Sequence, residues 1–240
     1  MDSNHRPWPA PASPWLMKQT WRHLLFAHWP VDPAVIRPYI PDSLELDIYD
    51  GRAWLGYIFF QVRGMRPKYL PPVPMLSSFP ELNIRTYVTY EDKPGVYFFS
   101  LDAQNFAGVQ GAKAFFHLPY AYARITLSQE NRQFACDCRR MNLSKTFKAR
   151  YQPVSEVFRA KPGSLDFWLS ERYCLYTEHK GNLFRGEILH NPWPLQEAEA
   201  RITKNTMMDF DGALQVEPPL VHYVEQQTAV MWGLQKVGGS

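Results

Sequence analysis

Apolar and polar residues alternate with a period of two along several segments of this chain, most clearly in residues 79–90 (FPELNIRTYVTY). A strand with one face in the core alternates in this way, because successive side chains point to opposite sides. One side carries Leu82, Ile84, Thr86 and Val88, and the other carries Glu81, Asn83, Arg85 and Tyr87. The second side joins an acid, an amide, a guanidinium and a phenol. It is therefore either a solvated outer face or the wall of a binding site.

Many other short segments are rich in β-branched and aromatic residues and are bounded by turn signals. The predicted strands lie at residues 20–30, 44–49, 52–64, 96–103, 122–129, 132–140, 146–153, 172–179, 183–190 and 229–237. The Asp50-Gly51 pair predicts a hairpin between the second and third of these segments. With no repeat and no domain-scale linker, the pattern predicts a mainly β protein with minor α structure, folded as one antiparallel barrel or sandwich.

Helical signals are few and short. Asp32 precedes Pro33 in one predicted helical turn, and Ser164 is the N-cap of another predicted helix over residues 164–171. Residues 105–117 form the best helix candidate in the first half of the chain, and helical turns are expected around residues 197–202 (EAEARI). We expect these helices at the rim of the strand assembly.

Two segments rich in proline are predicted to lack regular structure. Residues 66–78 (RPKYLPPVPMLSS) are expected to form a loop over the surface or over a cavity mouth. Residues 1–14 are expected to be an extended, mobile tail. Residues 15–240 would then form a single domain.

Composition narrows the class of protein. Hydrophobic residues make up 45% and charged residues 20% of the 240 residues, and the net charge is +3, so disorder and nucleic-acid binding are not indicated. The N-terminus has no apolar signal region, and no window has the ~18 apolar residues of a membrane span. Three cysteines, an odd and low number, predict reduced thiols in a cytoplasmic protein.

The segment from Phe106 onward offers an amine. At about 100° per residue, Lys113 and His117 fall on the helix stripe that the aromatic residues define. A lysine pressed against an apolar face has a lowered pKa, which is how amine nucleophiles are prepared. The alternative is a lysine whose stem packs while its ammonium group reaches water.

Further polar residues lie at strand ends. Tyr120 follows the proline that would end the helix, and Arg172 begins a strand, where it could pair with Glu81 or bind a carboxylate. His190 at another strand end is either a ligand contact or a hydrogen-bonded structural group. His28, His117 and His190 show no metal-ligand spacing with Glu81. No dinucleotide fingerprint, P-loop or GxSxG element is present, so no cofactor is predicted.

Taken together, these motifs resemble a known family over about residues 15–237. They are HWPVDP, FPELNIRTYV, PGVYFFSLDA, HLPYAYA, ERYCLY and LHNPWPLQEAEA, in the same order as in the YqjF-like bacterial proteins of the acetoacetate-decarboxylase-like superfamily. The resemblance implies a cone-like antiparallel β-barrel around a small cavity lined by polar and aromatic side chains. Members of the superfamily often assemble, which leaves the oligomeric state open.

The resemblance also implies part of a site. Acetoacetate decarboxylase forms a Schiff base on a lysine beside a second lysine, and Glu81 is similar in position to a cavity glutamate of that enzyme. The lysine pair is not present here: Tyr120 stands where the Schiff-base lysine would be, and Lys113 lies earlier. Decarboxylation of acetoacetate is therefore not implied.

Three hypotheses about function follow. In the first, the cavity binds a small carbonyl or carboxylate compound and possible lyase-like chemistry uses Glu81 and Lys113. The predicted ligand contacts are Asn83, Arg85, His117, Tyr120, Arg172 and His190. In the second, the protein is a non-catalytic sensor or binding module for such a compound. In the third, the polar side of residues 81–87 forms internal ion pairs that close the barrel.

Overall fold

The computed structural model describes residues 2–73, 76–104, 117–141, 143–210 and 217–239. Strands dominate it, and the predicted mainly β class is confirmed. The strands are β1 (Met17–Val31), β2 (Glu45–Leu46), β3 (Ala53–Pro67), β4 (Phe79–Tyr90), β5 (Lys93–Ala103), β6 (Tyr120–Glu130), β7 (Gln133–Arg140), β8 (Thr146–Pro153), β9 (Cys174–His179), β10 (Asn182–His190), β11 (Gln196–Asn205), β12 (Leu220–Met231) and β13 (Gln235–Gly239).

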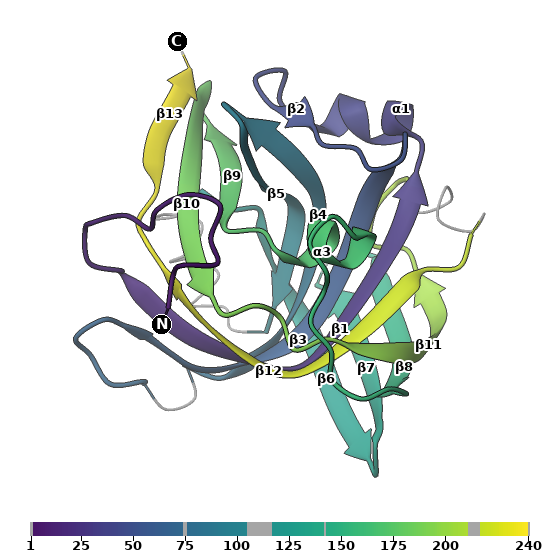
Figure 1. Ribbon diagram of the computed structural model, residues 1–240. Helices are drawn as coiled ribbons and strands as arrows, with labels where there is room; N and C mark the ends of the chain where they lie inside the picture. The colour runs from purple at the N-terminus through teal and green to yellow at the C-terminus, as the bar shows by residue number, and fades with distance from the viewer. Residues whose placement is uncertain (1, 74–75, 105–116, 142, 211–216, 240) are drawn as a thin grey trace.

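The strand pairings close two circuits that share a wall. The larger one, a closed nine-stranded barrel, runs through β5, β6, β7, β8, β11, β12, β1, β3 and β4. The smaller one leaves β5 through β9 and β10 and returns by the pairing of β10 with β12. Figure 1 shows β6, β7 and β8 on one side of the molecule and β9, β10 and β13 on the other. The strands β1, β3, β4, β5 and β12 therefore lie between two interiors.

This shared wall explains why the alternating side chains of β4 are buried on both faces. Leu82 and Ile84 belong to the main hydrophobic core. On the opposite face Glu81 and Tyr87 are also buried, because they point into the smaller circuit. The polar side of residues 81–87 is thus an inner wall and not a solvated face.

The short helices begin where the sequence predicts. Helix α1 (Pro33–Ile36) starts after Asp32, whose carboxylate accepts from the backbone N–H of Ala34 at 2.8 Å. A 3-10 turn, η1 (Arg37–Tyr39), continues it. Helix α3 (Leu165–Ser170) starts after Ser164, whose hydroxyl accepts from the N–H of Phe167 at 3.3 Å. Of the helix predicted at residues 105–117, residues 105–116 lie outside the described ranges.

Two local predictions were wrong. Residues 197–202 belong to strand β11, which pairs with β8 and β12, and are not helical. The hairpin around Asp50-Gly51 is limited to a single bridge between Tyr49 and Arg52, since β2 pairs with β4 and not with β3. In both cases pairing with a distant strand prevailed over the local signal.

No helix in the described ranges is long and apolar enough to cross a membrane.

Candidate functional site

The smaller circuit of strands encloses a cavity of about 580 Å³. Its lining is predominantly aromatic and aliphatic, with a few polar and charged groups, as is typical of small-molecule sites. Most of the residues predicted to form a site line this one cavity: Glu81, Asn83, Arg85, Tyr120, Arg172 and His190. Strands β4, β6 and β10 and the segment before β9 bring them together.

Glu81 lies in the cavity wall almost completely out of water, with 4% of its surface exposed. The Tyr120 hydroxyl donates to its Oε2 at 3.4 Å, and no ion pair reaches Glu81 from any described residue. Burial raises the pKa of Glu81 from 4.5 to about 8, against the opposing effect of hydrogen bonds from Tyr120 and Asn83, and the charge of Asp102 raises it further. At pH 7 Glu81 is therefore mostly protonated, as a general acid or a hydrogen-bond donor must be.

Arg85 is half-buried and is held by aromatic rings. Its guanidinium carbon lies 5.8 Å from the ring centroid of Phe26 and 5.7 Å from that of Tyr87. Within the described ranges it takes part in no ion pair, and its buried Nε has no hydrogen-bond partner. Because no carboxylate of the described chain occupies it, the guanidinium keeps its capacity to bind an anion in the cavity.

Arg172 also lies over the ring of Tyr87, with its guanidinium carbon 5.0 Å from that ring centroid. Its Nη1 pairs with Oδ2 of Asp47 at 2.6 Å, and its Nε donates to the carbonyl of Trp168 at 2.6 Å. The predicted ion pair of Arg172 with Glu81 is therefore wrong, because Arg172 pairs with Asp47 instead. The buried Nη2 of Arg172 has no partner in the described part of the chain.

Asn83 completes a group of unsatisfied polar atoms at the cavity wall. Its buried Oδ1 lacks a hydrogen-bond partner among the described residues, as do Nε of Arg85 and Nη2 of Arg172. Buried polar atoms without partners are rare in native proteins, because each one costs free energy. These atoms, together with the protonated carboxyl of Glu81, make one end of the cavity suitable for a polar ligand group.

His190 lines the cavity, but its ring is held by backbone. Nδ1 lies 2.9 Å from the carbonyl oxygen of Asn191 and Nε2 lies 3.2 Å from that of Arg172. Burial lowers the pKa of His190, so the ring is neutral and donates to one of these carbonyls. The ring also stacks on Tyr173 with centroids 4.8 Å apart. These contacts match the structural alternative, in which His190 fixes the corner after β10.

The structure does not bring His117 to the cavity. It stacks on His179, with ring centroids 4.0 Å apart, and lines a separate hollow beside Tyr97 and Thr177. Lys113 lies outside the described residues.

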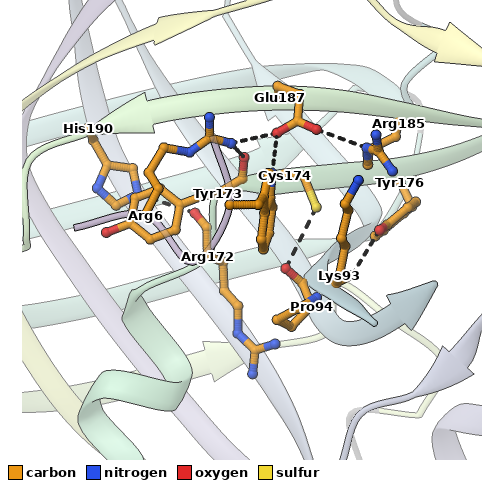
Figure 2. A network of polar contacts seen from close by, with 11 residues as sticks. Arg6, Lys93, Pro94, Arg172, Tyr173, Cys174, Tyr176, Arg185, Glu187 and His190 are labelled. Atoms are coloured by element: carbon orange, nitrogen blue, oxygen red, sulfur yellow. Dashed lines mark hydrogen bonds and ion pairs between the residues drawn. The ribbon is translucent and has the colours of Figure 1, made fainter. Parts of the chain in front are cut away.

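Glu187 on β10 is a charged wall residue that the sequence did not single out. Figure 2 shows its carboxylate between Arg6 and Arg185, with Oε2 2.5 Å from Nη2 of Arg6 and Oε1 2.9 Å from Nε of Arg185. Trp8 Nε1 adds a hydrogen bond of 3.0 Å to Oε2. The residues expected to form a mobile tail thus contribute a buried arginine that pairs with Glu187 in the cavity wall. The HRPWP motif, with a charge and an indole among small residues, is the only local signal of this contact.

Replacing Arg6 with methionine should lower the free energy of unfolding by about 2 kcal/mol, because a buried charge-assisted hydrogen bond to Glu187 is lost. Urea unfolding measures this change. Arg201→Met on the exposed side of β11 is the matched control and should change stability little. Equal unfolding midpoints for both variants would contradict the role assigned to Arg6.

The cysteines do not add a nucleophile. Cys136, Cys138 and Cys174 are free and buried, and burial raises the pKa of Cys136 and of Cys174 to about 12. They are therefore thiols at neutral pH, not thiolates. The described residues contain no group of three or more His, Cys, Asp or Glu side chains placed to hold a metal ion.

A closed nine-stranded barrel with a walled cavity beside it defines an acetoacetate-decarboxylase-like fold. Acetoacetate decarboxylase from Legionella pneumophila superposes with a TM-score of 0.69 at 10% identity, over 98% of this chain and 94% of that chain. The enduracididine biosynthesis enzyme MppR, solved in complex with pyruvate, superposes with a TM-score of 0.67 at 14% identity, over 96% and 93%. At such identities the likeness concerns the fold alone.

Sequence similarity identifies the family within this fold. Residues 18–228 match the DUF2071 model, described as "Uncharacterized conserved protein (COG2071)", so the chain belongs to the DUF2071 family. "Uncharacterized protein YqjF" of Bacillus subtilis (strain 168) is 47% identical over 224 residues, which is 92% of this chain and 93% of that protein. The predicted resemblance to YqjF-like proteins is thereby confirmed.

Proposed function

We propose that this protein binds a small carbonyl or carboxylate compound in the cavity of the smaller strand circuit. Arg85 and Arg172 donate hydrogen bonds to the anionic end of the ligand. Glu81, in its protonated form, donates to the carbonyl oxygen or passes its proton to the ligand, with Asn83 and Tyr120 beside it.

The observation that carries this proposal is the pair of buried guanidinium N–H groups without partners among the described residues, Nε of Arg85 and Nη2 of Arg172. Both residues line the same cavity and contact the same ring, that of Tyr87. A carboxylate placed there would accept charge-assisted hydrogen bonds from both. The complex of MppR with pyruvate supports this ligand class, because pyruvate joins a carboxylate to a carbonyl group.

Protonated Glu81 supports a carbonyl next to the carboxylate. An ionised glutamate would repel an anion in the same cavity, whereas a neutral carboxyl donates a hydrogen bond to a carbonyl oxygen. Since burial raises the pKa of Glu81 to about 8, ligand affinity should fall as pH rises above 8 and the carboxylate forms.

The free thiols of the three cysteines support the expected cytoplasmic location.

Calorimetric titration with a panel of 2-oxo and 3-oxo acids, and with neutral ketones of equal size, tests the proposal. Arg85→Met should weaken binding of the acids by about 10- to 100-fold, the value of a charge-assisted hydrogen bond, and should leave the ketones almost unaffected. Arg150→Met on the exposed side of β8 is the matched control. No heat of binding from any panel member, or equal losses in both variants, would reject the proposal.

Turnover is tested on the same panel. Product analysis by NMR after long incubation separates an enzyme from a non-catalytic binding module. Borohydride trapping followed by mass mapping asks whether Lys113 forms an imine with a bound carbonyl. The binding proposal does not depend on Lys113, so absence of an adduct would remove the imine mechanism only.

A further inference from the structure

The cavity has unsatisfied buried groups of charged side chains at one end, where Arg85 and Arg172 contact the ring of Tyr87. Its unsatisfied polar atoms on Asn83, Arg85 and Arg172 gather where β4 faces the segment before β9. Glu187, the other buried charge in the wall, is already paired with Arg6 and Arg185. An anionic ligand group therefore finds hydrogen-bond donors without partners at Arg85 and Arg172. The carboxylate of Glu187 is already paired and needs no partner from the ligand.

The wall that leads away from the arginine end is aromatic. The Phe26 ring, which contacts Arg85, meets the edge of Trp193 with centroids 5.0 Å apart. Trp193 stacks on Trp21 at 5.8 Å, and Trp21 meets Phe60 at 5.8 Å. The polar atoms of these rings are the indole Nε1 atoms of Trp21 and Trp193, which carry no charge and have no hydrogen-bond partner among the described residues. This wall suits an apolar chain.

The apolar lining continues to the protein surface. Leu16, Val73 and Leu76 line the cavity, yet they are 49%, 54% and 47% exposed, so they mark its mouth. From Leu16 to Phe26 the chain advances ten residues, mostly within β1, which corresponds to roughly 30 Å of extended strand. The cavity of about 580 Å³ falls within the range of roughly 300–1,000 Å³ for drug-sized ligands. A three- or four-carbon oxo acid would fill only its arginine end.

We infer that the ligand is an amphiphilic monocarboxylate, with its carboxylate at Arg85 and Arg172 and an apolar chain of several carbon atoms along Phe26, Trp193 and Trp21 toward the mouth. This inference rests on the proposed function and adds the class of ligand. It distinguishes this chain from a protein built for small keto acids alone.

Titration of the full chain with straight-chain saturated carboxylates of four to ten carbons, below the concentrations at which they aggregate, tests the inference. The dissociation constant should fall about fourfold for each added methylene, the value for removing one CH₂ from water. Alkanols of the same lengths should bind at least tenfold more weakly, because they lack the charge. Arg85→Met should weaken every carboxylate by a similar factor.

A variant near the mouth of the cavity distinguishes the binding of the ligand's apolar chain from the binding of its carboxylate. Met65 lines the cavity and is half-buried on β3, and Met65→Trp should obstruct the path of a long chain. We expect at least a tenfold loss for decanoate and less than a twofold loss for butanoate. Met141→Trp, at a residue that is 45% exposed and is no part of the cavity lining, is the matched control. If Met65→Trp does not fold, the chain-length series on the unmodified protein decides alone.

The outcomes distinguish this inference from the function on which it rests. Butanoate and decanoate that bind equally, with both weakened by Arg85→Met, would overturn the amphiphile and leave the proposed function standing. No binding by any carboxylate or oxo acid would reject both. A chain-length dependence that Arg85→Met and Met65→Trp leave unchanged would place the ligand outside this cavity and would overturn the inference.

Discussion

Replacing Glu81 with glutamine should stabilise the protein at neutral and alkaline pH. The folded state raises the pKa of Glu81 from 4.5 to about 8, so between these values the native state holds a proton that the unfolded state has released. Burial of Glu81 therefore costs stability, which declines by about 1.4 kcal/mol per pH unit as pH rises through this window. Summed over the window, the cost reaches about 5 kcal/mol at pH 8, and glutamine avoids it because it has no charge to desolvate.

Urea unfolding of the wild type and Glu81→Gln from pH 4 to pH 9 measures this effect. The difference in the free energy of unfolding should be near zero at pH 4, grow through the window and level off above pH 8. Glu130→Gln, at an exposed position near the end of β6, should show no such growth. Parallel pH profiles for the wild type and Glu81→Gln would contradict the raised pKa and, with it, the role of Glu81 as a proton donor. A stabilised variant that binds the ligand poorly would indicate that function retains this costly acid.

The strands were largely predictable because their signal is local. Alternation over residues 79–90 depends only on side chains pointing to opposite faces, and β4 has these bounds. The sequence predicts helical turns where β11 lies, because Glu, Ala and Arg favour helices in isolation. Pairing of β11 with β8 and β12 outweighs a preference of a few tenths of a kcal/mol per residue.

The location of the site was only partly predictable. The alternation in β4 separates Glu81, Asn83 and Arg85 from the core side, but it cannot say what covers the second face. Strands β9 and β10, about 90 residues further along the chain, provide that cover by pairing with β5 and β12. The ion pair of Arg172 with Asp47, 125 residues apart, is equally invisible in the sequence. The cavity was predicted from the resemblance to a family, because local sequence patterns could not indicate it.

Replacing Arg140 with methionine should be among the most destabilising single changes outside the cavity. Its Nε and Nη2 donate to the two carboxylate oxygens of Asp102 at 2.7 and 2.8 Å, and Nη2 also lies 2.5 Å from Oγ of Ser100. Asp102 is completely buried. Without Arg140 its carboxylate would keep, among the described residues, only the hydrogen bond from the Ser100 hydroxyl at 2.6 Å. Removing one partner of a buried ion pair typically costs about 3–5 kcal/mol. We expect a loss of about 3 kcal/mol, because Arg140 is partly accessible to solvent and water can partly replace it.

The pair is best tested by a double-mutant cycle with Asp102→Asn. Arg140→Met alone leaves a buried charge, whereas the double variant leaves none, so the double variant should regain part of the lost free energy of unfolding. Arg150→Met on β8 provides the exposed control. The Asp102→Asn variant also tests an effect on the cavity, because the charge of Asp102 is one of the causes that raise the pKa of Glu81. Asp102→Asn should therefore move the pH window of the Glu81→Gln difference downward. An unchanged window would show that Asp102 and Glu81 are not coupled. A double variant no more stable than Arg140→Met would contradict the ion pair of Arg140 with Asp102.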